Sequence, residues 1–274
     1  MIFQRLIWAS LAVALAVGLV QTGVQQLQAV PIILAAEVFE DQKIDAPAAD
    51  AATPATVAPA ATAHAGHEGQ AMAAEEAEEW APADGFERTA YTFLANVLHA
   101  FSMALLVFAV MGVAVWRGTT MRALPLALMT AAAGWLVFYL WPSLGLHAEI
   151  PGMDAARLGS RQGWWTLAAV SAAAACAVAA GMRGHLRWVI AAALLALPFV
   201  VGAPHITADP LAGFLGEAQA ELRDLGNQFI WATRWVSISF WVCMGVASGL
   251  AFQRWLQPAL RATFGTSNGL PQAA

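Results

Sequence analysis

Two histidines and a glutamate fall close together in the stretch AHAGHEG, as His64, His67 and Glu68. Neutral imidazole is a good ligand for divalent transition metals. A run of acids follows the pair: Glu75, Glu76, Glu78 and Glu79. Such a run raises the local concentration of divalent cations. The stretch therefore indicates weak metal capture, since ordering a flexible segment costs free energy; a solvated polar linker with no ligand role is the alternative.

A second group of possible ligands lies in the stretch WPSLGLHAEIPGMDAARLGSRQGWW. His147 and Glu149 are two residues apart, and Met153 and Asp154 follow after a Pro-Gly pair. A histidine and an acid at this spacing in a Gly/Pro-shaped loop can converge on one cation. They can equally form an interfacial turn in which His147 meets only water.

The third stretch with a possible ligand is GAPHITADP. Pro204 and Pro210 bracket His205 and Asp209, so the segment should be a stiff turn. His205 could be a metal ligand at that turn or a single surface histidine.

One histidine falls inside an apolar run. Arg88, Thr92, Asn96, His99 and Met103 recur at helical spacing, which predicts one polar face on one helix. Such a face should point away from lipid, toward the protein interior or a wet cavity. Asn96, His99 and Met103 could therefore line a metal path, or Asn96 and His99 could form interhelical hydrogen bonds.

Two other features of the apolar runs need an explanation. Arg234 lies about one turn inside the last run, where it either finds an acidic partner or extends to the interface. Gly245 and Gly249 form a G-x-x-x-G pattern, which permits close helix contact and which we expect to serve packing within the chain.

The composition shows what must position these residues. The chain is 59% hydrophobic and 11% charged, against about 25% charged in soluble domains. Runs near the length of a membrane span are Leu6–Val24, Tyr91–Trp116, Leu124–Trp141, Trp164–Met182, Leu186–Ala203 and Phe229–Trp255. We predict an all-α integral membrane bundle of about six transmembrane helices, with residues 1–274 forming one membrane domain. The fifth run is the weakest, because it is short and contains Pro198.

The first run resembles a signal peptide but lacks a convincing cleavage site, so we expect an uncleaved anchor helix that Pro31 kinks or ends. Short loops next to span ends are rich in arginine: Arg5, Arg117, Arg122, Arg183, Arg187, Arg254 and Arg261. Positive residues favour the cytoplasmic side. We therefore expect both termini in the cytoplasm, His185 in a basic cytoplasmic loop, and the three histidine-bearing loops outside.

The first outer loop, residues 25–88, is dominated by Ala, Pro, Thr and Glu. Such a composition buries too little apolar surface to offset ordering entropy, so we expect this loop to be mostly disordered.

Several functional classes find no support in the sequence. It contains no phosphate-binding P-loop and no G-x-S-x-G nucleophile motif. We expect no enzymatic activity, no tightly bound cofactor and no nucleic-acid partner. A haem or electron-transfer membrane protein remains a third interpretation, although only His99 lies within a run.

The stretches EEWAPADGFERTAYTFLANVL, GLHAEIPGMDAARLGSRQGWW and GAPH resemble the CbtA family of predicted cobalt transporter subunits, and the similarity covers almost the whole chain. The resemblance implies cobalt uptake linked to cobalamin supply, with a small single-span, histidine-containing subunit, CbtB, as the usual partner. It assigns His147, Glu149 and His205 to the candidate site. His64 and His67 form a shorter histidine run than relatives tend to carry, which gives His147 and His205 more weight.

The combined expectation is a subunit of an inner-membrane uptake system for Co2+ or a similar divalent metal, captured outside and passed inward. The alternative is a metal-binding or metal-sensing membrane subunit that conducts nothing. The residues do not separate Co2+ from Ni2+ or Zn2+, because the order of affinity depends on the metal as much as on the ligands.

Overall fold

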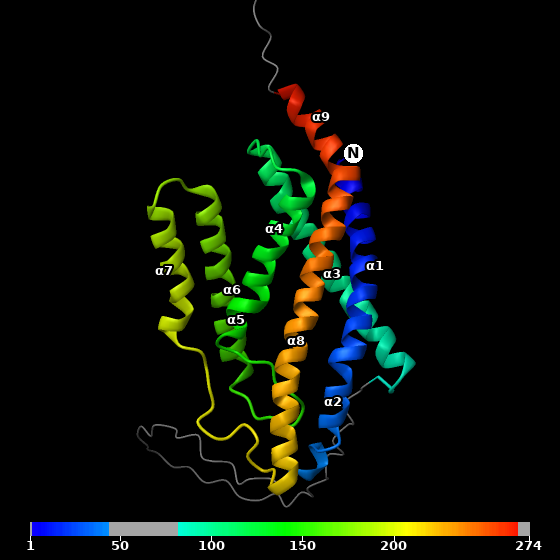
Figure 1. Ribbon diagram of the computed structural model, residues 1–274, viewed down its shortest axis with the longest axis vertical. Helices are drawn as coiled ribbons and strands as arrows, with labels where there is room; N and C mark the ends of the chain where they lie inside the picture. Colours follow the sequence, from blue (N-terminus) through cyan, green and yellow to red (C-terminus); the bar gives the residue numbers. More distant parts are fainter. Residues whose placement is uncertain (1, 44–81, 268–274) are drawn as a thin grey trace, which may run out of the picture.

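The computed structural model describes residues 2–43 and 82–267. This part of the chain is an all-helical bundle (Figure 1). Its elements are α1 (Ile2–Gln28), α2 (Val30–Glu37), the 3-10 turn η1 (Glu40–Gln42), α3 (Phe86–Trp116), α4 (Ala123–Trp135), the π-helix η2 (Leu136–Leu140), α5 (Trp141–Ser143), α6 (Leu158–Gly181), α7 (Leu186–Val201), α8 (Gly216–Ala251), the π-helix η3 (Phe252–Leu256) and α9 (Gln257–Ser267).

The prediction of about six membrane helices is confirmed. Five helical stretches are long and apolar enough to cross a membrane: Ile2–Gln28, Phe86–Trp116, Ala123–Ser143, Leu158–Gly181 and Gly216–Ala262. The sixth, α7, is apolar but shorter, at 16 residues. At 1.5 Å per residue α7 is about 24 Å long, less than a hydrocarbon core of about 30 Å. The short fifth run was correctly identified as the weakest.

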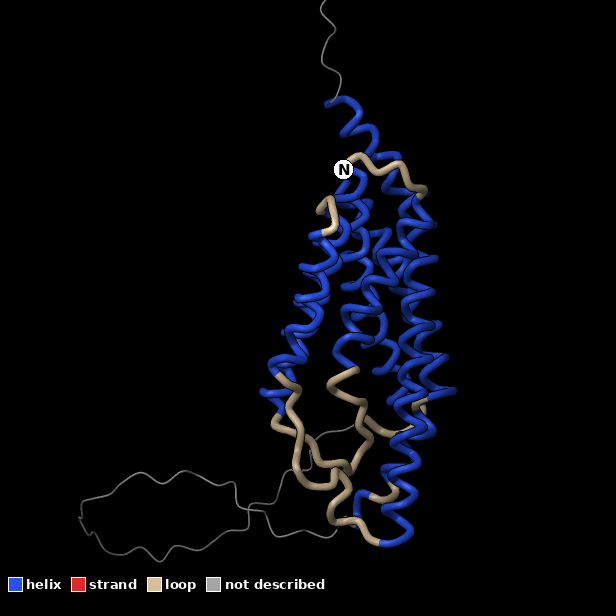
Figure 2. Tube along the Cα trace, turned by 60° about the vertical axis from the view of Figure 1, so that its left-hand side comes forward, coloured by secondary structure: helices blue, strands red, loops and turns tan. Residues whose placement is uncertain are grey.

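The two ends of the bundle differ in their connections. Short turns join α3 to α4 and α6 to α7 at the end where the described chain also begins and finishes (Figure 1). We call this the basic end, because these turns carry Arg117, Arg122 and Arg183. The loops 144–157 and 202–215 lie at the opposite end, the loop end (Figure 2).

The main core joins α1, α3, α4 and α8 through buried apolar side chains such as Ala14, Ala104, Met111, Ala127 and Met244. Close approach of α4 and α8 depends on the G-x-x-x-G pair. A Cβ on Gly249 would stand 2.9 Å from Leu124 Cδ1, and one on Gly245 would stand 3.0 Å from Ala131 Cβ. The expectation that this pattern packs within the chain is confirmed.

α6 and α7 form a hairpin beside this core, covered by α5 and η2. The indole of Trp141 donates to the Leu195 carbonyl at 3.0 Å, and that of Trp164 donates to the Pro198 carbonyl at 2.9 Å. Phe199 packs edge-on against both indoles. These contacts hold the short α7 near Pro198. A proline has no amide hydrogen to donate, so Pro198 interrupts the backbone hydrogen bonds of α7.

One residue, Ala29, separates α1 from α2. Pro31 occupies the first turn of α2, as expected of a proline that breaks a helix. Helical structure continues through η1 to Gln42, so the described beginning of the range 25–88 is folded. Its segment 44–81, with His64 and His67, lies outside the described residues.

Candidate functional site

A small apolar cluster supports the loop end. Buried Ala36, Ile150, Leu211, Phe214 and Leu222 come from α2, both long loops and α8. Burial of a large apolar side chain is worth about 1.5–3 kcal/mol, so this cluster can fix the loops on the helices. The two loops are also joined directly, because the Asp154 amide donates to the Pro210 carbonyl at 2.7 Å.

Glycines shape both loops at this cluster. Gly152 has φ 84°, and a Cβ there would stand 3.1 Å from the Phe214 ring. Gly202 has φ 87° where α7 ends, which turns the chain toward His205. A side chain is disfavoured at either backbone conformation, so the glycines help to set where the loop histidines lie.

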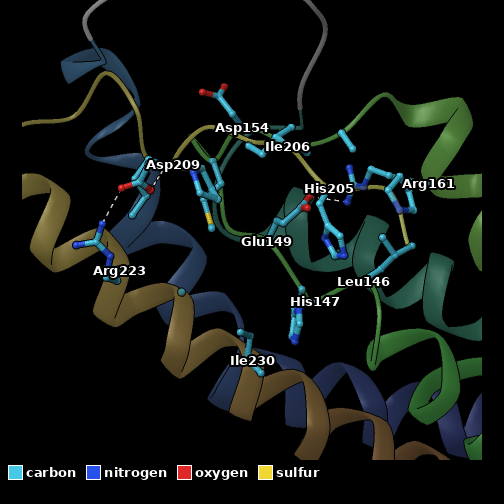
Figure 3. Close-up of a pocket in the computed structure, with 18 of the residues that line it drawn as sticks. Leu146, His147, Glu149, Asp154, Arg161, His205, Ile206, Asp209, Arg223 and Ile230 are labelled. Carbon is cyan, nitrogen blue, oxygen red and sulfur yellow. Dashed lines mark hydrogen bonds and ion pairs between the residues drawn. The ribbon is translucent and has the colours of Figure 1, made fainter. Parts of the chain in front are cut away.

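The loops and the first part of α8 enclose a cavity of about 330 Å³, the outer cavity (Figure 3). Both loop histidines line it, His147 from loop 144–157 and His205 from loop 202–215. Both side chains are exposed. In Figure 3, His147 lies toward Ile230 of α8. The structure therefore brings the two predicted loop stretches to one place.

Three carboxylates also line the outer cavity, and each one pairs with a cation. Glu149 accepts a hydrogen bond from Arg161 at the start of α6. Asp154 lies 2.6 Å from Lys43 Nζ, and Asp209 lies 3.0 Å from Arg223 of α8. Lys43 Nζ also donates to the Gly152 carbonyl at 3.1 Å.

These ion pairs limit how the outer cavity can bind a metal cation. A metal ion that takes Glu149 as a ligand must displace or share the Arg161 guanidinium. Throughout the described ranges, no group of three or more His, Cys, Asp or Glu side chains is arranged to hold a metal ion. The cavity is therefore a shared vestibule for His147, Glu149 and His205, and a metal site there requires side-chain movement.

A second cavity of about 390 Å³, the inner cavity, lies against η2, α5, α6 and α8. It shares five lining residues with the outer cavity: Leu146, His147, Ala148, Arg161 and Ile230. His147 therefore lies at the boundary of the two spaces. The inner cavity is also lined by Tyr139, Gln162, Thr233 and Arg234.

The polar face of α3 has a different neighbour. Asn96 donates to Thr22 Oγ1 at 3.0 Å and to Gln25 Oε1 at 2.7 Å, both on α1. His99 packs against the Phe240 ring, with 5.0 Å between centroids, and Met103 packs on the main core. None of the three lines the outer or inner cavity. The sequence left two roles open for Asn96, a metal path or an interhelical hydrogen bond. The structure shows the interhelical hydrogen bond.

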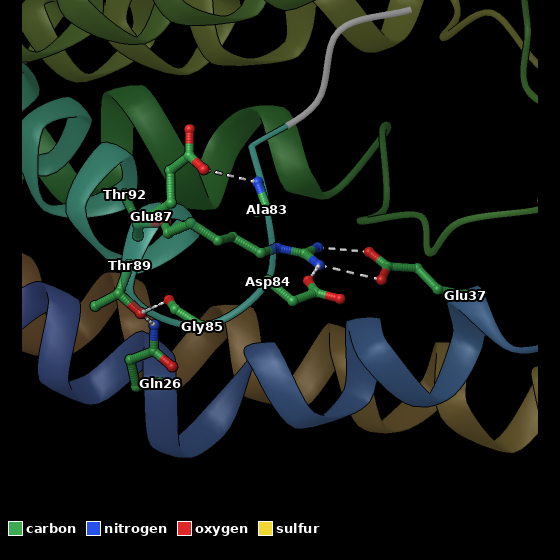
Figure 4. A network of polar contacts seen from close by, with 9 residues as sticks. Gln26, Glu37, Ala83, Asp84, Gly85, Glu87, Thr89 and Thr92 are labelled. Atoms are coloured by element: carbon green, nitrogen blue, oxygen red, sulfur yellow. Dashed lines mark hydrogen bonds and ion pairs between the residues drawn. The ribbon is translucent and has the colours of Figure 1, made fainter. Parts of the chain in front are cut away.

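At the loop end, the same face fixes α3 to α2 (Figure 4). Arg88 pairs with Glu37 of α2 and, at 3.0 Å, with Asp84. At the residue after Arg88, Gln26 of α1 donates to Thr89 Oγ1 at 3.1 Å. These contacts give the polar face a structural role along the α1–α3 contact.

Sequence reasoning did not single out the cations of the outer cavity. Lys43, Arg161 and Arg223 pair with its three carboxylates, and the only signal in the sequence is that some of them lie near acids. Of the acids that could reach Arg234 from other loops, Glu149 pairs with Arg161 and Asp154 pairs with Lys43. The Arg234 guanidinium lies 4.6 Å from the Trp231 ring centre. His185 lies exposed at the basic end, next to the α6–α7 turn.

Comparison with known proteins gives one family. A family model described as "Probable cobalt transporter subunit (CbtA)" matches residues 3–253. That range includes nearly all of α1, every helix from α2 to α8 and both histidine-bearing loops of the outer cavity. No curated protein and no solved structure matches the chain.

Proposed function

Because the chain belongs to the CbtA family of probable cobalt transporter subunits, and is a multi-pass membrane protein, we propose that it takes up Co2+ at the loop end. The observation that carries this proposal is the convergence of His147 and His205 on one cavity. The two imidazoles and Glu149 would receive the ion. His147 would then present it to the inner cavity, which it also lines.

The direction of transport depends on orientation. The arginine-rich turns collect at one end of the bundle and the acidic loops at the other, which supports a cytoplasmic basic end in the inner membrane. Both termini would then be cytoplasmic and the outer cavity would open outside. His64 and His67 would gather cation there, CbtB would be the partner subunit, and the chain itself would catalyse no reaction.

One observation favours the non-conducting alternative. A third cavity lies at the basic end, lined by Arg122, Gln253 and Arg261 among others, and it shares no lining residue with the inner cavity. A subunit that only binds metal at the loop end would need no connection between them. A conducting subunit would need helix movement or a partner to complete the path.

Uptake and binding measured together separate the two functions. In a host without its own cobalt uptake, the chain should raise accumulation of radioactive Co2+, with CbtB supplied if needed. Loss of one imidazole ligand, worth about 1.4 kcal/mol or more, should raise the half-saturating Co2+ concentration about tenfold in His147→Ala or His205→Ala.

His185→Ala is the matched control, because it removes an exposed imidazole from the basic end. It should leave uptake unchanged. If purified chain binds Co2+ through His147 and His205 while accumulation never exceeds that of the empty host, the accessory-subunit function is correct instead.

A further inference from the structure

The charged side chains that line the inner cavity are arginines. Two arginines, Arg161 and Arg234, line it together with the amide of Gln162 and the hydroxyl groups of Tyr139, Ser143 and Thr233. Among the residues described, no aspartate or glutamate lines this cavity. Its chemistry therefore differs from that of the outer cavity, which three carboxylates line.

Arg234 brings a charge to the inner cavity that none of the acids in the described ranges neutralises. It lies on α8 within the membrane-spanning stretch Gly216–Ala262, and its guanidinium stacks on Trp231. The ion pairs found in the described ranges do not include it. An arginine in a membrane helix normally pairs with an acid, with backbone oxygens or with a ligand.

Arg161 adds an unsatisfied donor. Its terminal nitrogen Nη2 donates to Glu149, but its Nε is buried and has no hydrogen-bond partner. A buried donor without a partner costs about 1–3 kcal/mol. A ligand with several acceptor oxygens would satisfy this donor and balance the Arg234 charge.

We propose that the inner cavity binds an oxyanion, a phosphate or carboxylate group, held by Arg234 and Arg161. One guanidinium group can donate two parallel hydrogen bonds to such oxygens, and the Gln162 amide in the same lining can add another. The space of about 390 Å³ is ample for such a group. The group is either a free anion or the phosphate of a lipid headgroup.

Anion binding in the inner cavity does not depend on cobalt transport, but it would change how the cavity receives a cation. A bare divalent cation is repelled by the Arg234 guanidinium, whose charge none of the ion pairs in the described ranges balances. A bound oxyanion removes that repulsion at the boundary where His147 lies. Anion binding can be measured whether or not the chain transports metal.

The test uses the full chain, purified in a neutral maltoside detergent and freed of lipid. Thermal unfolding is followed with increasing inorganic phosphate, and with acetate as a carboxylate, each against chloride at equal ionic strength. Phosphate or acetate should stabilise the protein saturably beyond chloride, since a ligand that binds only the folded state raises its stability. Arg234→Gln should weaken that binding about tenfold or more.

Arg187→Gln is the matched control, because Arg187 also stacks on a neighbouring tryptophan, Trp188, but lies at the basic end of the bundle. It should keep the full effect. If Arg234→Gln does not fold, Arg234→Lys keeps the charge, loses the paired donors and should bind phosphate or acetate more weakly. Equilibrium dialysis with radioactive phosphate gives the affinity of the folded protein directly.

Native mass spectrometry of the chain before delipidation separates the two sources. Phospholipid retained by the unmodified chain and lost in Arg234→Gln identifies a headgroup, whereas stabilisation by phosphate or acetate without retained phospholipid identifies a free anion. The proposal is overturned if no anion stabilises beyond chloride and no phospholipid is retained. It is also overturned if Arg234→Gln and Arg234→Lys behave as the unmodified chain does.

Discussion

Glu149 and Arg161 form an ion pair at the junction of the two loop-end cavities, with Arg161 lining both and Glu149 lining only the outer one. Their side chains are 31% and 28% exposed, so the pair is largely shielded from water. The carboxylate proposed as a metal ligand is thus already occupied by a cation of the protein. Metal binding at the outer cavity and the Glu149–Arg161 contact compete.

The first prediction separates the two roles of Glu149. Glu149→Gln alone leaves the Arg161 charge without its partner, which should cost about 1–3 kcal/mol and lower the amount of folded protein. The double variant Glu149→Gln with Arg161→Gln removes both charges and keeps a hydrogen-bonding pair, so folded protein should recover. Folded protein is measured by fluorescence-detected size exclusion.

Uptake by this double variant then identifies the ligand. If Glu149 binds Co2+, uptake per folded molecule should remain well below normal after folding has recovered. Normal uptake in the double variant would show that Glu149 serves only its ion pair, leaving His147 and His205 as the ligands.

Topology is the second prediction. A phosphatase that is active only outside the cytoplasm should work when fused after Asp209, which lies in a loop of the outer cavity. The same reporter fused after Ala274 should be silent, because the basic end should face the cytoplasm. A reporter that is fluorescent only in the cytoplasm should give the opposite pattern. Activity after Ala274 and silence after Asp209 would reverse the direction proposed for transport.

The third prediction concerns His64 and His67, which lie outside the described residues. If they only gather cation, replacing both with Ala should slow Co2+ uptake at low external metal and have little effect at high metal. The measurement is the initial uptake rate across a range of Co2+ concentrations. An equal fractional loss at every concentration would place the pair in an obligatory site.

The fourth prediction concerns His99, which packs on Phe240 and lines neither loop-end cavity. His99→Ala should cost about 0.5–1.5 kcal/mol of bundle stability, as for other contacts between aromatic rings. Uptake per folded molecule should stay near normal. Abolished uptake at normal abundance would instead assign His99 to the metal path, with Met103 as its neighbour on the same face.

The fifth prediction tests the α4–α8 contact. Gly249→Leu places a side chain where even a Cβ would stand 2.9 Å from Leu124 Cδ1. Overpacking of this kind should cost about 1–3 kcal/mol or more, and the thermal midpoint in detergent should fall. Gly112→Leu is the matched control, since nothing lies within 4 Å of a Cβ at that position of α3. Equal effects of the two substitutions would rule out close packing as the reason for Gly249.

The sequence by itself determined the helices and where their ends would collect. Apolar run length and arginine placement are local properties, so the six helices, the weakness of α7 and the break near Pro31 could all be predicted without knowing any contact. The same local pattern identified His147 and His205 as loop residues. It also predicted the polar face of α3, because helical period depends only on spacing.

Only the tertiary structure decided what those residues meet. The α3 face could have bordered a path or another helix, and Asn96 lies against α1 because of how the helices pack. Glu149 and Arg161 are 12 residues apart and Lys43 and Asp154 are 111 apart, and neither spacing reveals an ion pair. Partner choice depends on which loops the bundle brings together, and that arrangement follows from the packing of the whole chain.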